Sequence, residues 1–193
     1  MNTPNKLTVF RAVMVPVFLA VLLIPAIPAR FLLSALIFGG LALTDMIDGK
    51  MARKYGLITN FGKFLDPLAD KVLVVSALVG MTVLKTYSNS AFVFWLIGII
   101  IILAREFMVS GLRLVCVEQG NVIAANMWGK VKTVTQFIAI LLILAIEQAL
   151  VWFPVLPEWI RLIGDAVFGL CVLATIVSGI IYVKQNASGI GEM

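Results

Sequence analysis

Four aspartates lie close together in a chain that has only 10 acidic residues and no histidine. Asp45 and Asp48 are three positions apart, and Asp66 and Asp70 are four positions apart. At about 100° per residue, the members of each pair share one face of a helix. A cluster of oxygen ligands without histidine or cysteine selects hard cations. The pattern therefore predicts a site for Mg²⁺ or Mn²⁺, in which four carboxylates can hold two ions.

Such a site indicates phosphoryl-transfer chemistry. Two divalent ions about 3.5 to 4 Å apart neutralise phosphate oxygens and stabilise a leaving group. Small residues, which let a ligand or another helix approach the backbone, accompany the aspartates: Gly49, Ala52, Gly62 and Ala69. We therefore expect a phosphate or diphosphate ester as substrate. The alternative is a set of interfacial ion pairs with five nearby bases: Lys50, Arg53, Lys54, Lys63 and Lys71.

The elements that must position these aspartates are membrane helices. The 193 residues are 62% hydrophobic and 13% charged, whereas soluble domains carry roughly 25% charged residues. A span needs about 20 apolar residues, and six runs qualify: 9–29, 31–52, 67–86, 91–115, 127–151 and 158–183. The sequence predicts an all-α polytopic membrane protein with six transmembrane helices.

We expect a single membrane domain over residues 1–193, because no connection is long enough for a separate soluble domain. A short interfacial segment is predicted at residues 1–8 and a frayed tail at residues 185–193. The alternative for the first apolar run is a cleaved signal peptide, which would leave an odd number of spans.

The basic residues predict the orientation of the bundle. If both termini are cytoplasmic, 12 of the 15 lysines and arginines lie on the inner side, and only Arg30, Lys85 and Arg161 lie outside. This asymmetry agrees with the positive-inside rule for six spans. The first aspartate pair comes at the end of the second run and the second pair at the start of the third. We therefore expect a cytoplasmic-side active site.

Residues 45–70 match the pattern D-x2-D-G-x2-A-R-x8-G-x3-D-x3-D. The pattern resembles the signature of the CDP-alcohol phosphotransferase family at every fixed position. The resemblance implies a membrane enzyme that displaces CMP from a CDP-linked lipid with the hydroxyl of an acceptor alcohol. It further implies that all four aspartates bind the metals and that Asp70 also takes the proton from the acceptor. The implied nucleotide contacts are Gly49, Arg53 and Thr59.

The N-terminal stretch resembles the juxtamembrane element N-x-x-T-x-x-R of the same family. Asn5, Thr8 and Arg11 are spaced to share one helical face, and the resemblance implies that they lie near the CDP group of CDP-diacylglycerol. The alternative is a polar stripe at the membrane interface, with Arg11 extending to lipid phosphates.

Two further motifs bear on the acceptor alcohol. R-E-x4-G-L-R at residues 105–113 and G-K-x-K-T at residues 129–133 are similar to the branch that makes phosphatidylglycerophosphate from CDP-diacylglycerol and glycerol 3-phosphate. An acceptor with its own phosphate needs cations, and the candidates are Arg105, Arg113, Lys130 and Lys132. The alternative is that these bases only follow the positive-inside rule.

Other readings of the function stay open at this point. Phosphatidylinositol phosphate synthase also takes a phosphorylated acceptor, and phosphatidylserine or cardiolipin synthase would be further members of the family. From a different class, a divalent-cation transporter would place carboxylates near the bilayer midplane rather than at one interface. The family implies a homodimer, and we expect a bacterial inner membrane as the location.

Overall fold

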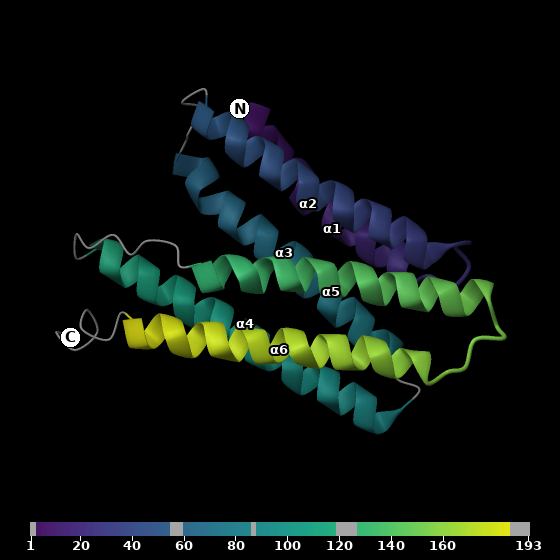
Figure 1. The fold of residues 1–193 in the computed structure, drawn as a ribbon. Coiled ribbons are helices and arrows are strands. Elements are labelled where there is room, and N and C mark those ends of the chain that lie inside the picture. The colour runs from purple at the N-terminus through teal and green to yellow at the C-terminus, as the bar shows by residue number, and fades with distance from the viewer. Residues whose placement is uncertain (1–2, 55–59, 86–87, 119–126, 186–193) are drawn as a thin grey trace. The chain divides into compact units, whose positions relative to one another are not determined.

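The described part of the chain forms six helices in the computed structural model (Figure 1). In chain order they are α1 (Thr3–Leu23), α2 (Arg30–Lys54), α3 (Asn60–Leu84), α4 (Asn89–Glu118), α5 (Met127–Trp152) and α6 (Ile160–Gln185). The residues that the structure describes contain no strand, which confirms the all-α prediction.

The structure describes residues 3–54, 60–85, 88–118 and 127–185. At the helical residues 3–5, 45–54, 60–68, 70, 114–115 and 117–118 it describes the backbone alone.

The helices extend beyond the apolar runs at the ends that carry the aspartates. α2 continues to Lys54, and α3 begins at Asn60, well before the start of the third run. The two residues by which α2 passes the second run are Arg53 and Lys54, and both residue types are good helix formers. Both aspartate pairs therefore lie on continuous helix rather than in a loop.

Two compact units make up the fold. The first contains residues 1–84 and 140–161, which are α1, α2, α3 and the C-terminal half of α5. The second contains residues 85–139 and 162–193, which are α4, the N-terminal half of α5 and α6. Helix α5 contributes to both.

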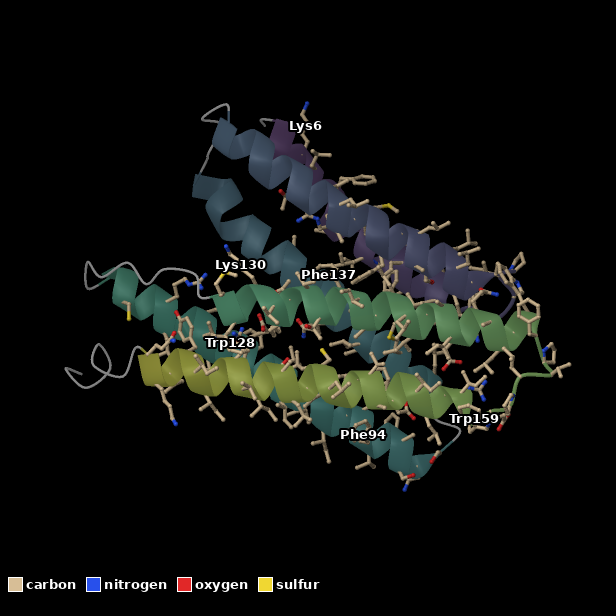
Figure 2. The ribbon with its side chains drawn as sticks, viewed as in Figure 1. Lys6, Phe94, Trp128, Lys130, Phe137 and Trp159 are labelled. Atoms are coloured by element: carbon tan, nitrogen blue, oxygen red, sulfur yellow. The ribbon has the colours of Figure 1, made fainter. Side chains whose placement is uncertain are left out.

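Four helices are long and apolar enough to cross a membrane. The spans are Lys6–Leu23, Asn89–Arg113, Met127–Trp152 and Ile160–Gln185, with mean hydropathies between 2.0 and 2.4. Shorter apolar stretches occur at Arg30–Thr44 in α2 and Lys71–Leu84 in α3. Large apolar side chains such as Phe94 and Trp159 are exposed (Figure 2), as expected of a surface that faces lipid rather than water.

In the first unit, α1 packs against α2 and α3. Phe18 of α1 lies against Phe38 of α2, with ring centroids 6.0 Å apart. A Cβ atom at Gly80 of α3 would lie only 2.8 Å from Leu22 Cδ2, so the absence of a side chain there lets α1 and α3 approach closely.

A side chain of α5 fixes the first turn of α2 in the same unit. The Oε1 atom of the buried Gln148 accepts a hydrogen bond from the backbone N–H of Leu32 at 3.0 Å. First-turn N–H groups have no partner within their own helix, so this contact satisfies one of them. Because α2 carries Asp45 and Asp48 toward its other end, Gln148 helps to set the axial position of both.

In the second unit, an aromatic stack joins α4 and α6. Trp95 and Phe168 are parallel within 4°, with ring centroids 4.0 Å apart. Trp95 Nε1 also donates a hydrogen bond of 2.8 Å to Asp165, which pairs with Lys85 at 3.3 Å. A Cβ atom at Gly98 would lie 2.5 Å from the Phe168 ring, so only glycine fits beside this stack.

Replacing Gly98 by alanine should therefore destabilise the second unit. The Phe168 ring cannot retreat freely because Trp95 is stacked on its face, and overpacking of a core typically costs about 1–3 kcal/mol. We expect a lower midpoint in thermal unfolding of the detergent-solubilised protein.

Gly111→Ala on the same helix is the matched control, because a Cβ atom there would meet nothing within 4 Å. Alanine is favoured over glycine inside a helix by roughly 0.5–1 kcal/mol, so its midpoint should stay level or rise. An unchanged midpoint for Gly98→Ala would contradict a rigid stack.

Candidate active site

The four aspartates lie near the C-terminal end of α2 and the N-terminal end of α3, which follow each other in the chain. Asp45 and Asp48 are in the last turns of α2, and Asp66 and Asp70 are in the first half of α3. Figure 1 shows the end of α2, the start of α3 and the N-terminus of α1 at one end of this unit. Because both segments are helical, the i, i+3 and i, i+4 spacings put each pair on one face.

At the four aspartates the structure describes the backbone alone, and the same holds for Asn5, Gly49 and Arg53. Thr59 lies outside the described residues. Metal binding by the aspartates and nucleotide binding by the other four remain predictions. Among the described residues, no group of three or more acidic, cysteine or histidine side chains could hold a metal ion.

Thr8 and Arg11 lie on the buried face of α1, in the first unit. Thr8 is 1% exposed and Arg11 is fully buried. The same face continues through Val15, Phe18 and Leu22, at steps of three and four residues. A guanidinium inside the bundle needs charge or hydrogen-bond compensation, and its burial argues against the alternative in which Arg11 extends to lipid phosphates.

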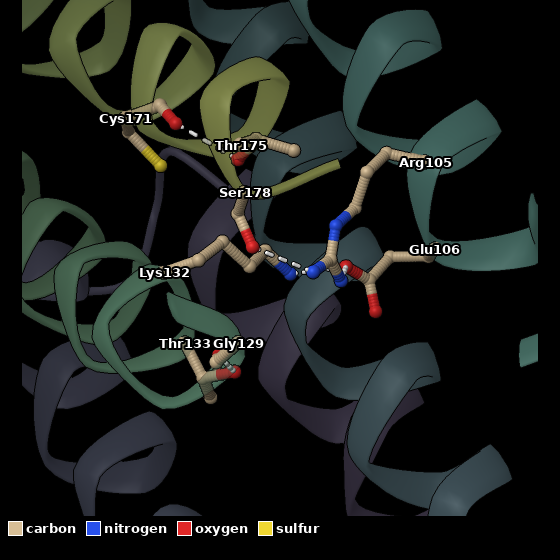
Figure 3. Close-up of polar contacts among 8 residues, drawn as sticks. All are labelled: Arg105, Glu106, Gly129, Lys132, Thr133, Cys171, Thr175 and Ser178. Carbon is tan, nitrogen blue, oxygen red and sulfur yellow. Dashed lines mark hydrogen bonds and ion pairs between the residues drawn. The ribbon is translucent and has the colours of Figure 1, made fainter. Parts of the chain in front are cut away.

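A buried polar cluster lies among α4, α5 and α6 of the second unit (Figure 3). It consists of Arg105, Glu106, Lys132 and Ser178, and we call it the Arg105 cluster. Arg105 Nη1 lies 3.1 Å from Glu106 Oε1, and Arg105 Nη2 donates to Ser178 Oγ at 2.7 Å. Lys132 Nζ pairs with the same oxygen of Glu106. One carboxylate oxygen thus serves two cations.

The Arg105 cluster carries an excess of positive charge. Arg105 and Lys132 are two cations against the single carboxylate of Glu106, and their side chains are 10%, 4% and 18% exposed, respectively. The Nε atom of Arg105 is buried and has no hydrogen-bond partner among the described residues. A buried unpaired charge or donor is costly. The cluster is therefore suited to bind an anion, which would supply both the missing charge and the missing acceptor.

The four predicted acceptor-phosphate residues separate into two pairs. Arg105 and Lys132 meet in the cluster through Glu106. Arg113 and Lys130 are exposed, and within the described chain neither belongs to the cluster. Lys130 is labelled in Figure 2.

Sequence reasoning did not anticipate the contribution of α6 to this cluster. Ser178 accepts a hydrogen bond from Arg105, and a Cβ atom at the adjacent Gly179 would lie 3.1 Å from Arg105 Cγ. The only signal in the sequence is a pair of small residues, serine and glycine, inside an otherwise apolar helix. Small residues mark close helix contacts in membrane proteins, but the pattern does not name the partner.

The sequence is similar to those of known proteins of one family. Residues 1–160 match the family described as CDP-alcohol phosphatidyltransferase. The chain is 40% identical to the CDP-diacylglycerol–glycerol-3-phosphate 3-phosphatidyltransferase of Bacillus subtilis, over 96% of this chain and 95% of that protein. It is 36% identical to a probable phosphatidylglycerophosphate synthase of Mycobacterium tuberculosis, over 98% of this chain and 84% of that protein. The protein therefore belongs to the CDP-alcohol phosphatidyltransferase family, as its aspartate signature indicated.

Proposed function

We propose that this protein transfers the phosphatidyl group of CDP-diacylglycerol to glycerol 3-phosphate and releases phosphatidylglycerophosphate and CMP. The observation that carries the proposal is the positively charged Arg105 cluster, with its unpartnered Nε donor. An acceptor that bears its own phosphate brings a net negative charge and acceptor oxygens, whereas zwitterionic serine brings no net charge. Inositol phosphate would also bring both. The names of the similar proteins from Bacillus subtilis and Mycobacterium tuberculosis favour glycerol 3-phosphate.

We propose that all six helices cross a bacterial inner membrane and that the active site faces the cytoplasm. The apolar parts of α2 and α3, Arg30–Thr44 and Lys71–Leu84, are shorter than the other four spans. Their polar, aspartate-bearing ends would then lie at the membrane surface. The distribution of lysine and arginine supports the cytoplasmic side for these ends. The family resemblance also implies a homodimer, which we retain as an expectation.

Asp45, Asp48, Asp66 and Asp70 are the proposed ligands of two Mg²⁺ or Mn²⁺ ions. The donor set fits such ions because it offers only carboxylate oxygens, and the helical backbone puts each pair on one face. When bound, the ions neutralise the diphosphate oxygens and stabilise charge on the departing CMP.

The proposed reaction is an in-line displacement at the lipid-side phosphorus. Asp70 accepts the proton from the primary hydroxyl of glycerol 3-phosphate, the new phosphorus–oxygen bond forms, and the bond to CMP breaks. General-base assistance of this kind typically contributes about 10²–10⁴ in rate.

The remaining predicted residues bind and orient the two substrates. The residues proposed to bind the CDP group of the donor are Asn5, Thr8, Arg11, Gly49, Arg53 and Thr59. The phosphate of glycerol 3-phosphate is the proposed ligand of Arg105 and Lys132, assisted by the exposed bases Arg113 and Lys130. Holding both substrates in place lowers the entropic part of the barrier.

Asp66→Asn tests the metal site. The substitution keeps the side-chain volume and removes a negative charge, so we expect near-complete loss of Mg²⁺-dependent CMP release from a protein that still extracts as a folded bundle. Activity should be measured across a Mg²⁺ titration. A wild-type rate at low Mg²⁺ would contradict the two-metal proposal.

Asp70→Asn separates the general base from the metal ligands. We expect a loss of rate of about 10²-fold or more, with binding of CDP-diacylglycerol retained because the nucleotide contacts lie elsewhere. Single-turnover CMP release and equilibrium binding of the donor should be compared in the same preparation. Lost binding together with normal single-turnover chemistry would make Asp70 a ligand only.

Neutral substitution at Lys132 or Arg113 tests the acceptor-phosphate site. Hydrogen bonds to charged groups contribute roughly 1.5–3 kcal/mol, and about 1.4 kcal/mol corresponds to a tenfold change. For Lys132→Gln and Arg113→Gln we expect the KM for glycerol 3-phosphate to rise on the order of ten- to a hundredfold. The KM for CDP-diacylglycerol should change little.

The control for lost positive charge is Lys184→Gln, an exposed lysine in the last turn of α6. It should leave both KM values near those of the wild type. If the two test variants weakened both substrates equally, or neither, the bases would serve only the membrane orientation.

A further inference from the structure

Helix α6 lies against Arg105 in the second unit at two consecutive residues, Ser178 and Gly179. Figure 3 shows the contact with Ser178. The hydroxyl of Ser178, a residue only 2% exposed, accepts the hydrogen bond from Arg105 Nη2 at 2.7 Å. At the next residue, Gly179, an added Cβ atom would lie 3.1 Å from Arg105 Cγ and 3.7 Å from Met108 Cε. One residue holds the guanidinium and the other gives space to the aliphatic stem.

These contacts matter because Arg105 would otherwise be poorly fixed. A long arginine side chain loses rotamer entropy when it is ordered. Its ionic partner, Glu106, is the adjacent residue of the same helix, and residues i and i+1 do not face each other on a helix. Contacts from α6 are therefore what can select a single position for the guanidinium.

The selected position leaves a specific donor available. Nη1 is directed to Glu106 and Nη2 to Ser178, while Nε is buried and finds no hydrogen-bond partner in the part of the chain that the structure describes. A phosphate oxygen placed at Nε would give this buried donor an acceptor. A side chain that rotated freely would not present this donor consistently.

We infer that Ser178 and Gly179 are positioning residues that hold Arg105 for the phosphate monoester of the acceptor alcohol, an inference that rests on the proposed function. Neither residue touches the acceptor. Ser178 acts by accepting the Nη2 hydrogen bond, and Gly179 acts by leaving room for the stem of Arg105.

The test compares Ser178→Ala, Gly179→Ala and Thr175→Val in the purified full-length protein. Steady-state CMP release is measured with glycerol 3-phosphate varied at saturating CDP-diacylglycerol, and then with the substrates exchanged. Thr175 is the matched control, because it is buried one turn earlier on α6 and its hydroxyl bonds back to the Cys171 carbonyl at 2.8 Å. Ser178→Thr, which retains a hydroxyl, is the conservative variant.

We expect Ser178→Ala to raise the KM for glycerol 3-phosphate roughly three- to tenfold, the range for one lost hydrogen bond. The KM for CDP-diacylglycerol should stay close to the wild-type value. Gly179→Ala should act in the same direction, because its methyl group would displace the stem of Arg105. Ser178→Thr should recover most of the loss, and Thr175→Val should leave both KM values unchanged whatever it does to thermal stability.

A double-mutant cycle with Arg105→Gln identifies the route of the effect. Residues that act through one shared partner are non-additive. In the Arg105→Gln background, Ser178→Ala should therefore cause no further rise in the KM for glycerol 3-phosphate. An additive rise would overturn the inference, and so would equal effects of Ser178→Ala and Thr175→Val or equal weakening of both substrates.

Failure of the proposed function gives a different result. If the wild-type protein released no CMP with glycerol 3-phosphate, the acceptor assignment would be wrong and the inference would fall with it. If the wild type were active and Arg105→Gln raised the KM for glycerol 3-phosphate while Ser178→Ala and Gly179→Ala did not, only the positioning role would be refuted.

Discussion

The cost of keeping charge inside an apolar helical bundle governs the rest of this structure. A charged side chain away from water is tolerated when a partner compensates it. Three times in the described chain, a cation meets a carboxylate from a different helix or connection: Lys85 with Asp165, Lys132 with Glu106, and Arg161 with Glu147. These contacts fix helix positions that apolar packing alone would leave free to slide.

The ion pairs differ in charge balance, and this difference distinguishes a structural pair from one suited to bind a ligand. Lys85 and Asp165 form a balanced pair, completed by the Trp95 N–H and the face of the Trp95 ring. Nothing in that pair calls for a ligand. Within the described residues, the Arg105 cluster instead has two cations for one carboxylate and a buried donor without a partner. An enzyme that binds an anionic substrate benefits from such an imbalance, because the substrate restores the balance.

Packing around these charges depends on small residues at a few close contacts. Gly98 admits the Phe168 ring beside Trp95, and Gly80 lets α1 approach α3. Gly179 serves the same purpose beside Arg105. Lipid offers little hydrophobic driving force between helices, so close approach and polar contacts must supply the association. The glycines therefore support the polar clusters as much as the apolar core.

Local sequence patterns were sufficient to predict most of the helices and the family of the protein. Apolar runs predicted six helices, and the aspartate spacing predicted two face-sharing pairs and the family. Helix ends were less accurate, because α2 and α3 continue through polar residues that hydropathy excludes but helix propensity allows. The spacing of three residues also predicted that Thr8 and Arg11 share one face of α1, but only the structure showed that this face is buried.

Contacts between distant helices needed the tertiary structure. From the sequence, Arg105, Arg113, Lys130 and Lys132 looked like one set. Of these four, the structure pairs Arg105 and Lys132 with Glu106 and leaves Arg113 and Lys130 exposed. The hydrogen bond from Arg105 to Ser178, and that from the Leu32 N–H to Gln148, join residues far apart in the chain. Periodicity within a helix fixes which residues share a face, because the backbone sets the rotation per residue. It does not fix the axial register between two helices, because that register is decided by packing and by compensation of buried charge across the whole unit.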